Sequence, residues 1–109
     1  MPTNEFEDAI DGKAKHIQTY VLKLYITGMT PNSVRAVRNI KKFCQRYFKE
    51  GECNLEIIDV YQNAELAKGE EIIATPTLIK KSPGMASRIV GDLSDEKKML
   101  RILSITDIH

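Results

Sequence analysis

The sequence predicts a mixed α/β domain whose elements follow the order βαβαββα. An apolar strand over residues 20–26 is followed by an amphipathic helix to about residue 49 and a second strand over residues 55–60. A Pro-Gly turn later separates two further short strands. A strand–helix–strand unit predicts a right-handed parallel crossover, and the short turn predicts an antiparallel hairpin. Helices should therefore cover both faces of one sheet, which gives a three-layer sandwich.

The first strand and the start of the first helix carry clear local signals. Residues 20–26 are nearly all apolar, which is typical of an interior strand that is covered on both faces. Lys23 is the exception, and its aliphatic stem can carry the ammonium group to the edge of the sheet. Thr30 followed by Pro31 predicts a helix start, because a hydroxyl can cap free N–H groups and proline suits the first helical position.

The first helix has an apolar side and a basic side. Its apolar residues recur mostly at three- and four-residue spacing and should face the sheet: Val34, Val37, Ile40, Cys44, Tyr47 and Phe48. Its basic residues share much of the opposite side: Arg35, Arg38, Lys42, Arg46 and Lys49. Solvation alone explains such a basic side, and the alternative is a docking stripe for an acidic partner surface.

The second half of the chain predicts a short helix and then a hairpin. Asn63 can cap a helix over residues 64–68, and Gly69 can end it. Residues 77–81 and 87–90 are the two strands that flank the Pro-Gly turn.

A last helix follows the hairpin. Ser94 is predicted to cap its first turn, because a hydroxyl just before a periodic apolar pattern is a typical helix start. Met99, Leu100 and Leu103 should form its buried face, together with Ile102.

Length and charge define the broad class. A chain of 109 residues fits one domain, which we place at residues 19–109. Residues 1–18 are mostly polar and are predicted to be a flexible extension, with docking of Phe6 and Ile10 on a neighbour as the alternative. A net charge of +1 argues against nucleic-acid and membrane surfaces, and the chain has neither a membrane span nor a signal peptide, so we expect a cytoplasmic protein.

The residues that usually carry chemistry are sparse. Cys44 lies on the apolar side of the first helix and Cys53 is predicted to lie in the following loop; a disulfide between them is conceivable, but reduced thiols are the expectation in the cytosol. His16 and His109 have no Cys or carboxylate partners at metal-ligand spacing. We therefore predict no catalytic residue, no metal site and no cofactor.

The loop around Thr75 and Pro76 resembles the proline loop that faces the redox motif of thioredoxins. This resemblance implies a thioredoxin-like fold with a cis bond before Pro76, whereas a proline that only shapes the turn is the alternative. The two places of the Cys-x-x-Cys motif hold Thr30 and Ser33. A pair of hydroxyls cannot supply an activated thiolate, so the usual reaction is absent.

Longer blocks of the chain resemble the KaiB circadian-clock proteins. They include Thr-Pro-Asn-Ser-Val-Arg at 30–35, Ile-Asp-Val at 58–60, Ile-Ala-Thr-Pro-Thr-Leu at 73–78 and Arg-Ile-Val-Gly-Asp-Leu-Ser at 88–94. The match runs from about residue 19 to residue 103. It implies a non-enzymatic regulator that binds the ring ATPase KaiC, sequesters KaiA and competes with a KaiB-like sensor domain of a histidine kinase.

The KaiB resemblance also implies a metamorphic protein. Its binding form would be a thioredoxin-like monomer, and its resting form would be an oligomer, a dimer or a tetramer, with a rearranged C-terminal half. Such a protein needs two packings that differ by only a few kcal/mol.

Particular residues follow from the same resemblance. Basic positions expected to face KaiC correspond to Lys23, Arg35, Lys80 and Arg88. Positions expected to serve the fold switch or the structure correspond to Tyr20, Thr75, Pro76, Gly91 and Asp92. Glu56 and Glu71 stand where the cyanobacterial proteins commonly carry lysine. This reversal of charge indicates a homologue outside the core cyanobacterial oscillator, serving stress adaptation with its own KaiC-like ATPase.

Two other functions remain as alternatives at this point. One is a thioredoxin-like thiol-disulfide oxidoreductase that uses Cys44 or Cys53, although neither cysteine lies at the start of the first helix. The other is a sensor-like module that binds a histidine kinase through the same fold.

Overall fold

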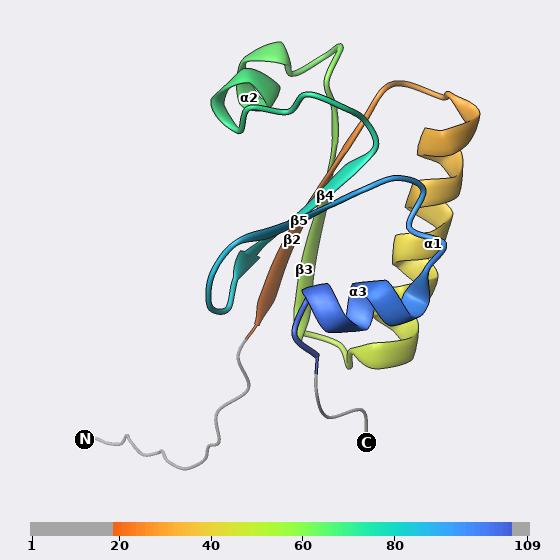
Figure 1. Ribbon diagram of the computed structural model, residues 1–109, viewed down its shortest axis with the longest axis vertical. Coiled ribbons are helices and arrows are strands. Elements are labelled where there is room, and N and C mark those ends of the chain that lie inside the picture. The colour runs from red at the N-terminus through yellow and green to blue at the C-terminus, as the bar shows by residue number, and fades with distance from the viewer. Residues whose placement is uncertain (1–18, 106–109) are drawn as a thin grey trace.

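A computed structural model of the chain describes residues 19–105. The predicted extension over residues 1–18 lies outside the described residues, as do residues 106–109. The element order is the predicted βαβαββα (Figure 1). The bounds are β2 Tyr20–Ile26, α1 Pro31–Tyr47, β3 Cys53–Asp59, α2 Ala64–Gly69, β4 Thr77–Ser82, β5 Ser87–Val90 and α3 Glu96–Ile102.

The strands form one four-stranded sheet in the order β3-β2-β4-β5. β2 and β3 are parallel, with α1 as their crossover, and Tyr20 lies opposite Cys53. β4 is antiparallel both to β2 and to β5, so the predicted hairpin is confirmed. The ends of β2 and β3, the start of β4 and the end of β5 therefore share one end of the sheet.

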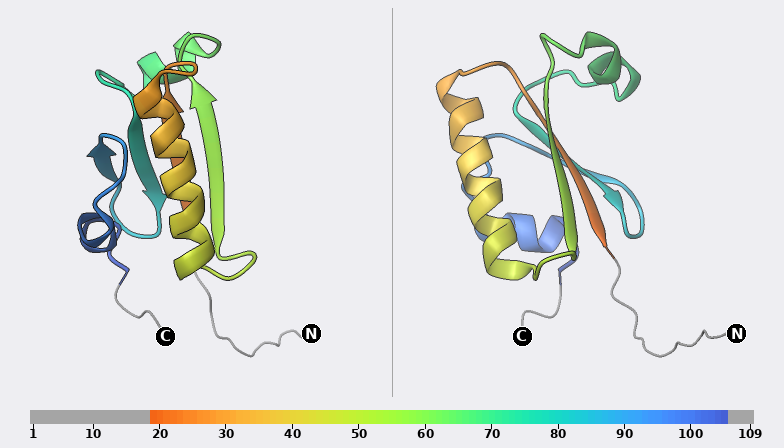
Figure 2. Two further views of the ribbon diagram at one scale, coloured as in Figure 1. Left: turned by 90° about the vertical axis from the view of Figure 1, so that its right-hand side faces the viewer. Right: turned by 180° about the vertical axis from the view of Figure 1, so that it is seen from behind.

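The two faces of the sheet carry different layers. α1 and α3 cover one face, and the short helix α2 lies over one end of the other (Figures 1 and 2). Leu22, Leu24 and Leu78 pack in the large core under α1 and α3. Tyr25 and Ile79 belong to a smaller core with Ala67 of α2 as well as Ile58. This division follows from the period of two along each strand, which sends neighbouring side chains to opposite faces.

The start of α1 agrees with the sequence, and most of its predicted apolar side packs on the core, although some of its most buried residues were not predicted. The Thr30 hydroxyl accepts a hydrogen bond from the Ser33 N–H, and Pro31 is the first helical residue. The fully buried residues of the helix are Ser33, Ala36, Ile40 and Phe43. Val34, Val37, Cys44 and Tyr47 are only partly buried, and Phe48 lies just past the helix end. Ile40 is thus buried as predicted, and Val37, Cys44, Tyr47 and Phe48 pack at the edge of the same core, whereas the burial of Ser33, Ala36 and Phe43 was not predicted.

Three local predictions are corrected. Asn63 occupies the position before α2, but its side chain makes no capping hydrogen bond; its side-chain amide donates to the Asp59 carbonyl at 3.2 Å. Asp95, not Ser94, caps α3, and its carboxylate accepts from the Lys98 N–H at 3.0 Å. Cys53 begins β3 instead of lying in a loop, because pairing with β2 extends the strand to it.

Met99 and Leu103 are buried as predicted, and Leu100 and Ile102 pack at the edge of the same core. The Thr75–Pro76 bond is cis, as the thioredoxin resemblance implied, and the Gly91 N–H donates to the Pro76 carbonyl at 2.9 Å. Gly91 has a φ of +124°, a backbone conformation that favours glycine. This contact ties the end of β5 to the start of β4. Among residues 19–105, no helix is long and apolar enough to span a membrane.

Candidate partner-binding surface

Arg35 lies in the first turns of α1 and contacts the segment that follows β5. Its Nε lies 3.3 Å from Asp92 Oδ2, and its guanidinium also donates to the Asn32 side-chain carbonyl. About half of the Arg35 side chain remains exposed. The ion pair therefore orients Arg35 beside the start of the helix without removing it from solvent.

Asp92 organises the loop between β5 and α3. Its carboxylate accepts from the Ser94 N–H at 3.1 Å, and its carbonyl accepts from the Asn39 side-chain amide at 2.8 Å. Hydrogen bonding from Ser94, with a smaller contribution from Arg35, holds the pKa of Asp92 below its ordinary value. Asp92 is thus a structural residue that also positions Arg35.

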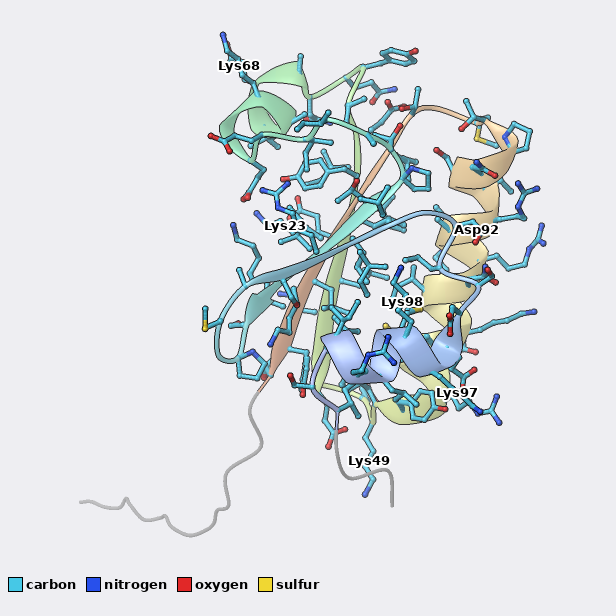
Figure 3. All side chains as sticks on the ribbon, viewed as in Figure 1. Lys23, Lys49, Lys68, Asp92, Lys97 and Lys98 are labelled. Atoms are coloured by element: carbon cyan, nitrogen blue, oxygen red, sulfur yellow. The ribbon has the colours of Figure 1, made fainter. Side chains whose placement is uncertain are left out.

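Lys23 and Arg88 lie on the opposite face of the sheet, together with three further charged side chains. We call this set the charged cluster: Lys23, Glu56, Glu70, Lys81 and Arg88. In Figure 3, Lys23 and Asp92 lie on opposite sides of the strands. Two of the predicted partner-binding residues are therefore separated from Arg35 by the sheet.

The charged cluster is internally paired. Lys23 Nζ lies 4.0 Å from Glu56, Lys81 pairs with Glu70, and the Arg88 guanidinium donates to the carbonyls of residues 70 and 71. Hydrogen bonding from Lys81, aided by the charges of Lys23 and Arg88, lowers the pKa of Glu70. The positive charges of the charged cluster are thus largely balanced by neighbouring carboxylates and carbonyls.

Lys80 occupies a different environment from the other three predicted contacts. It is only 4% exposed, and its ammonium donates to the Pro83 carbonyl at 2.7 Å. Strand alternation places it on the face of Leu78, under the end of α3. In this conformation Lys80 is not available to a partner.

Exposed apolar side chains gather where the strands end. Met29 is 85% exposed in the loop before α1, Tyr61 is 78% exposed after β3, and Ile73 is 97% exposed before β4. Leu66 of α2 is also exposed. We call these four residues the loop end, because they all belong to segments that connect elements at the same end of the sheet (Figure 1).

The loop end continues into a shallow apolar groove along α1. Its floor is formed by Ile26, Met29, Val34 and Val37, and Arg38 and Lys41 stand on its rim. Contiguous exposed apolar surface rimmed by charge is typical of protein-binding sites. The signal in the sequence was weak: Met29 and Ile73 are isolated apolar residues in loops, where periodicity gives no information.

The remaining predicted structural residues hold this frame together. The Tyr20 hydroxyl donates to the Ser104 carbonyl at 3.3 Å, its ring centroid lies 4.9 Å from that of Phe48, and burial raises the pKa of Tyr20. Thr75 forms a hydroxyl–hydroxyl hydrogen bond with Thr27, which joins the loops after β2 and before β4. The Thr27–Thr75 contact holds together two loops of the loop end, whereas the Tyr20 contacts tie the start of β2 to the segments after α1 and α3 at the opposite end of the sheet.

The start of α1 holds hydroxyls where thioredoxins hold their redox motif. The Ser33 hydroxyl is buried and accepts from the Thr27 N–H at 3.0 Å. Cys44 lies in the third turn beyond it, towards the other end of the helix. Within residues 19–105, no group of three or more His, Cys, Asp or Glu side chains is placed to hold a metal ion.

A KaiB domain model matches residues 23–105. This chain belongs to the KaiB family. The circadian clock oscillator protein KaiB of Picosynechococcus sp. is 52% identical over 83 residues, which cover 76% of this chain and 79% of that protein. The circadian clock oscillator protein KaiB1 of Synechocystis sp. is 49% identical over 83 residues, which cover 76% of this chain and 78% of that protein.

Solved structures place this KaiB-family chain in the thioredoxin-like fold. The N-terminal domain of Synechococcus elongatus SasA superposes with a TM-score of 0.68 at 22% identity, covering 93% of this chain and 97% of that one. Mitochondrial thioredoxin 3 of Saccharomyces cerevisiae gives a TM-score of 0.65 at 16% identity, covering 82% and 80%. At these identities the likeness concerns the fold alone.

Proposed function

We propose that this KaiB-family protein is a non-enzymatic clock or stress-response regulator that binds a KaiC-like ring ATPase through the loop end and Arg35. Its membership of a family of circadian clock proteins supports the regulatory role. The protein would act in the cytoplasm, where a KaiA-like protein or a histidine-kinase sensor domain would bind or compete with it.

The observation that carries this proposal is the set of exposed apolar side chains at the loop end, together with a half-exposed arginine in the first turns of α1. Met29 and Ile73 are almost fully in water, which is unfavourable for large apolar side chains that have no partner. Arg35, in the first turns of α1, is held in place by its ion pair with Asp92. An apolar centre with an oriented arginine at its rim is a typical composition for a protein interface.

The charged cluster is a weaker candidate for direct contact. Glu56 lies beside Lys23, and the Arg88 guanidinium is already engaged by two carbonyls. A partner would have to replace these contacts at comparable strength. We therefore assign Lys23 and Arg88 to the rim of the interface, and we propose that Glu56 and Glu71 adapt this homologue to its own KaiC-like ATPase outside the core oscillator.

A fold switch would change which residues can be reached. Lys80 is covered in the thioredoxin-like conformation, so its predicted contact with KaiC requires the β4–β5 turn to move. We propose that the chain exchanges between this conformation and a rearranged oligomer, a dimer or a tetramer, and that the ATPase selects one of them. A partner can shift such an equilibrium only by its difference in affinity for the two states.

The position of the cysteines in the fold does not favour the alternative of a thiol-disulfide oxidoreductase. The cysteines lie away from the start of α1, where the helix dipole and free N–H groups would activate a thiolate.

The proposal can be tested by size-exclusion chromatography with light scattering, using the KaiC-like ATPase of the same organism and ATP. We expect wild-type protein to co-elute with the ring and Ile73→Asp to fail, because a carboxylate would be buried in an apolar contact. Met85→Asp is the matched control: Met85 is 88% exposed and lies in the β4–β5 turn, at the other end of β4. Equal co-elution of all three proteins would contradict the proposed surface.

A further inference from the structure

The two cysteines of the chain lie side by side, although they are distant from the loop end. Cys44 is in the last turns of α1, and Cys53 is the first residue of β3. Their sulfur atoms are 3.5 Å apart, and both residues are half-buried at the edge of the large core. Because the chain contains two cysteines in all, these thiols have only each other as an internal partner.

The geometry around the pair favours bond formation. An S–S bond of about 2.05 Å needs the sulfurs to approach by about 1.5 Å, which side-chain rotation and a small shift of the connecting turn can supply. That turn is well ordered: the Lys49 carbonyl accepts from the Glu52 N–H, and the Lys49 N–H donates to the Glu52 carboxylate. The thiols are thus held near each other by the backbone before any oxidation.

The two sulfurs are also chemically unequal. The two thiols share one hydrogen bond, in which either sulfur can be the donor. With Cys44 as the donor, the contact stabilises a thiolate on Cys53 and lowers its pKa, whereas the same contact and burial raise the pKa of Cys44. A thiolate is the species that attacks a disulfide. Cys53 is therefore suited to be the attacking residue, and Cys44 to be the resolving one.

We propose that Cys44 and Cys53 form a reversible disulfide by exchange with a small-molecule disulfide, which makes this pair a redox modification site. The Cys53 thiolate attacks one sulfur of the oxidant and releases one small thiolate, leaving a mixed disulfide on Cys53. Cys44 loses its proton, attacks the Cys53 sulfur and releases the second small thiol. Two protein thiols are oxidised, one small disulfide is reduced to two thiols, and the electrons balance.

The bond would tether the end of α1 to the start of β3. It would close a short loop around the turn at residues 48–52 and leave the loop end unchanged. Closing such a loop restricts the unfolded chain, so the oxidised protein should unfold at a higher temperature. The site would thus couple the redox state of the surroundings to the stability of the α1–β3 unit, independently of the proposed ATPase contact.

The test is a redox titration of the full-length protein with mixtures of reduced glutathione and glutathione disulfide, followed by acid quenching and intact mass measurement. We expect a monomer that is lighter by two hydrogens and has no free thiol, restored by dithiothreitol. Its Tm should rise by roughly 10 °C on oxidation. Two free thiols at a large excess of glutathione disulfide, or disulfide-linked dimers, would overturn the proposal.

Single cysteine variants test which of the two sulfurs attacks the small-molecule disulfide first. Cys44→Ala should stop at a stable Cys53–glutathione mixed disulfide, because the resolving thiol is missing. Cys53→Ala should react much more slowly, and neither variant should show the oxidation-dependent rise in Tm. A wild-type protein that accumulates the mixed disulfide as readily as Cys44→Ala does would show that the two sulfurs cannot close the bond.

Discussion

The two faces of the sheet use the same strands but differ in what covers them. Under α1 and α3, Leu24 and Leu78 are fully enclosed in a continuous apolar core. On the other face, Tyr25 and Ile79 lie below one short helix and the charged cluster. We therefore expect the face under α1 and α3 to contribute most of the stability, while the other face and the loop end leave charged and apolar side chains within reach of other molecules.

The largest expected change in the free energy of unfolding comes from truncating Leu78 and Ile79, two neighbouring residues of β4 that point to opposite faces of the sheet. Leu78→Ala should reduce the free energy of unfolding by about 4 kcal/mol, because two helices hold the cavity open. Ile79→Ala should cost about 2 kcal/mol, since the aliphatic stems of Lys81 and Arg88 can move towards the space. Urea unfolding of both variants measures the difference. An equal or larger loss for Ile79→Ala would show that the faces do not differ in this way.

A smaller change in the free energy of unfolding is expected when the pH is lowered, and one carboxylate on each face of the sheet contributes to it. The pKa values of Asp92 and Glu70 are lower in the folded protein than their ordinary values, so the unfolded chain binds protons more readily. Their contribution to stability is present above about pH 4–5 and is lost as the pH falls through the folded pKa values. Wild-type unfolding free energy should thus decline on acidification.

Replacing each carboxylate by its amide distinguishes the contributions of the two faces to the pH dependence of stability. Asp92→Asn and Glu70→Gln should each flatten part of the acid limb of the stability curve, and the double variant should show the sum of the two effects, because the sites lie on opposite faces. Urea midpoints between pH 2.5 and pH 7 provide the measurement. A single variant that abolishes the whole acid limb would place the pH dependence on one face only.

The sequence predicted most of the fold because its signals are local. The apolar runs, the Thr30–Pro31 start and the Pro-Gly turn each specify an element from adjacent residues, and the structure contains all seven in the expected order. The caps were less predictable. Ser94 and Asp95 are both good capping residues, and only the backbone geometry decides that Asp95 caps α3.

The candidate surface was harder to predict because it depends on contacts between distant segments. Lys80 is buried because strand alternation turns it to the covered face and Pro83 supplies a carbonyl. The sequence separates Arg35 from Asp92 by 57 residues, and only the return of β5 joins them. Likewise, the nearness of Cys44 to Cys53 depends on β3 starting at Cys53, which follows from its pairing with β2.

Measuring how Arg35 variants bind the ring ATPase tests whether the loop end and Arg35 form the partner surface. Arg35→Glu and Lys97→Glu change the net charge equally, but Lys97 lies on α3, far from the loop end (Figure 3). We predict that Arg35→Glu raises the dissociation constant of the complex with the ATP-loaded ring by about tenfold or more, and that Lys97→Glu stays within about twofold of wild type. Equal dissociation constants for the two variants would contradict a partner surface built on the loop end and Arg35.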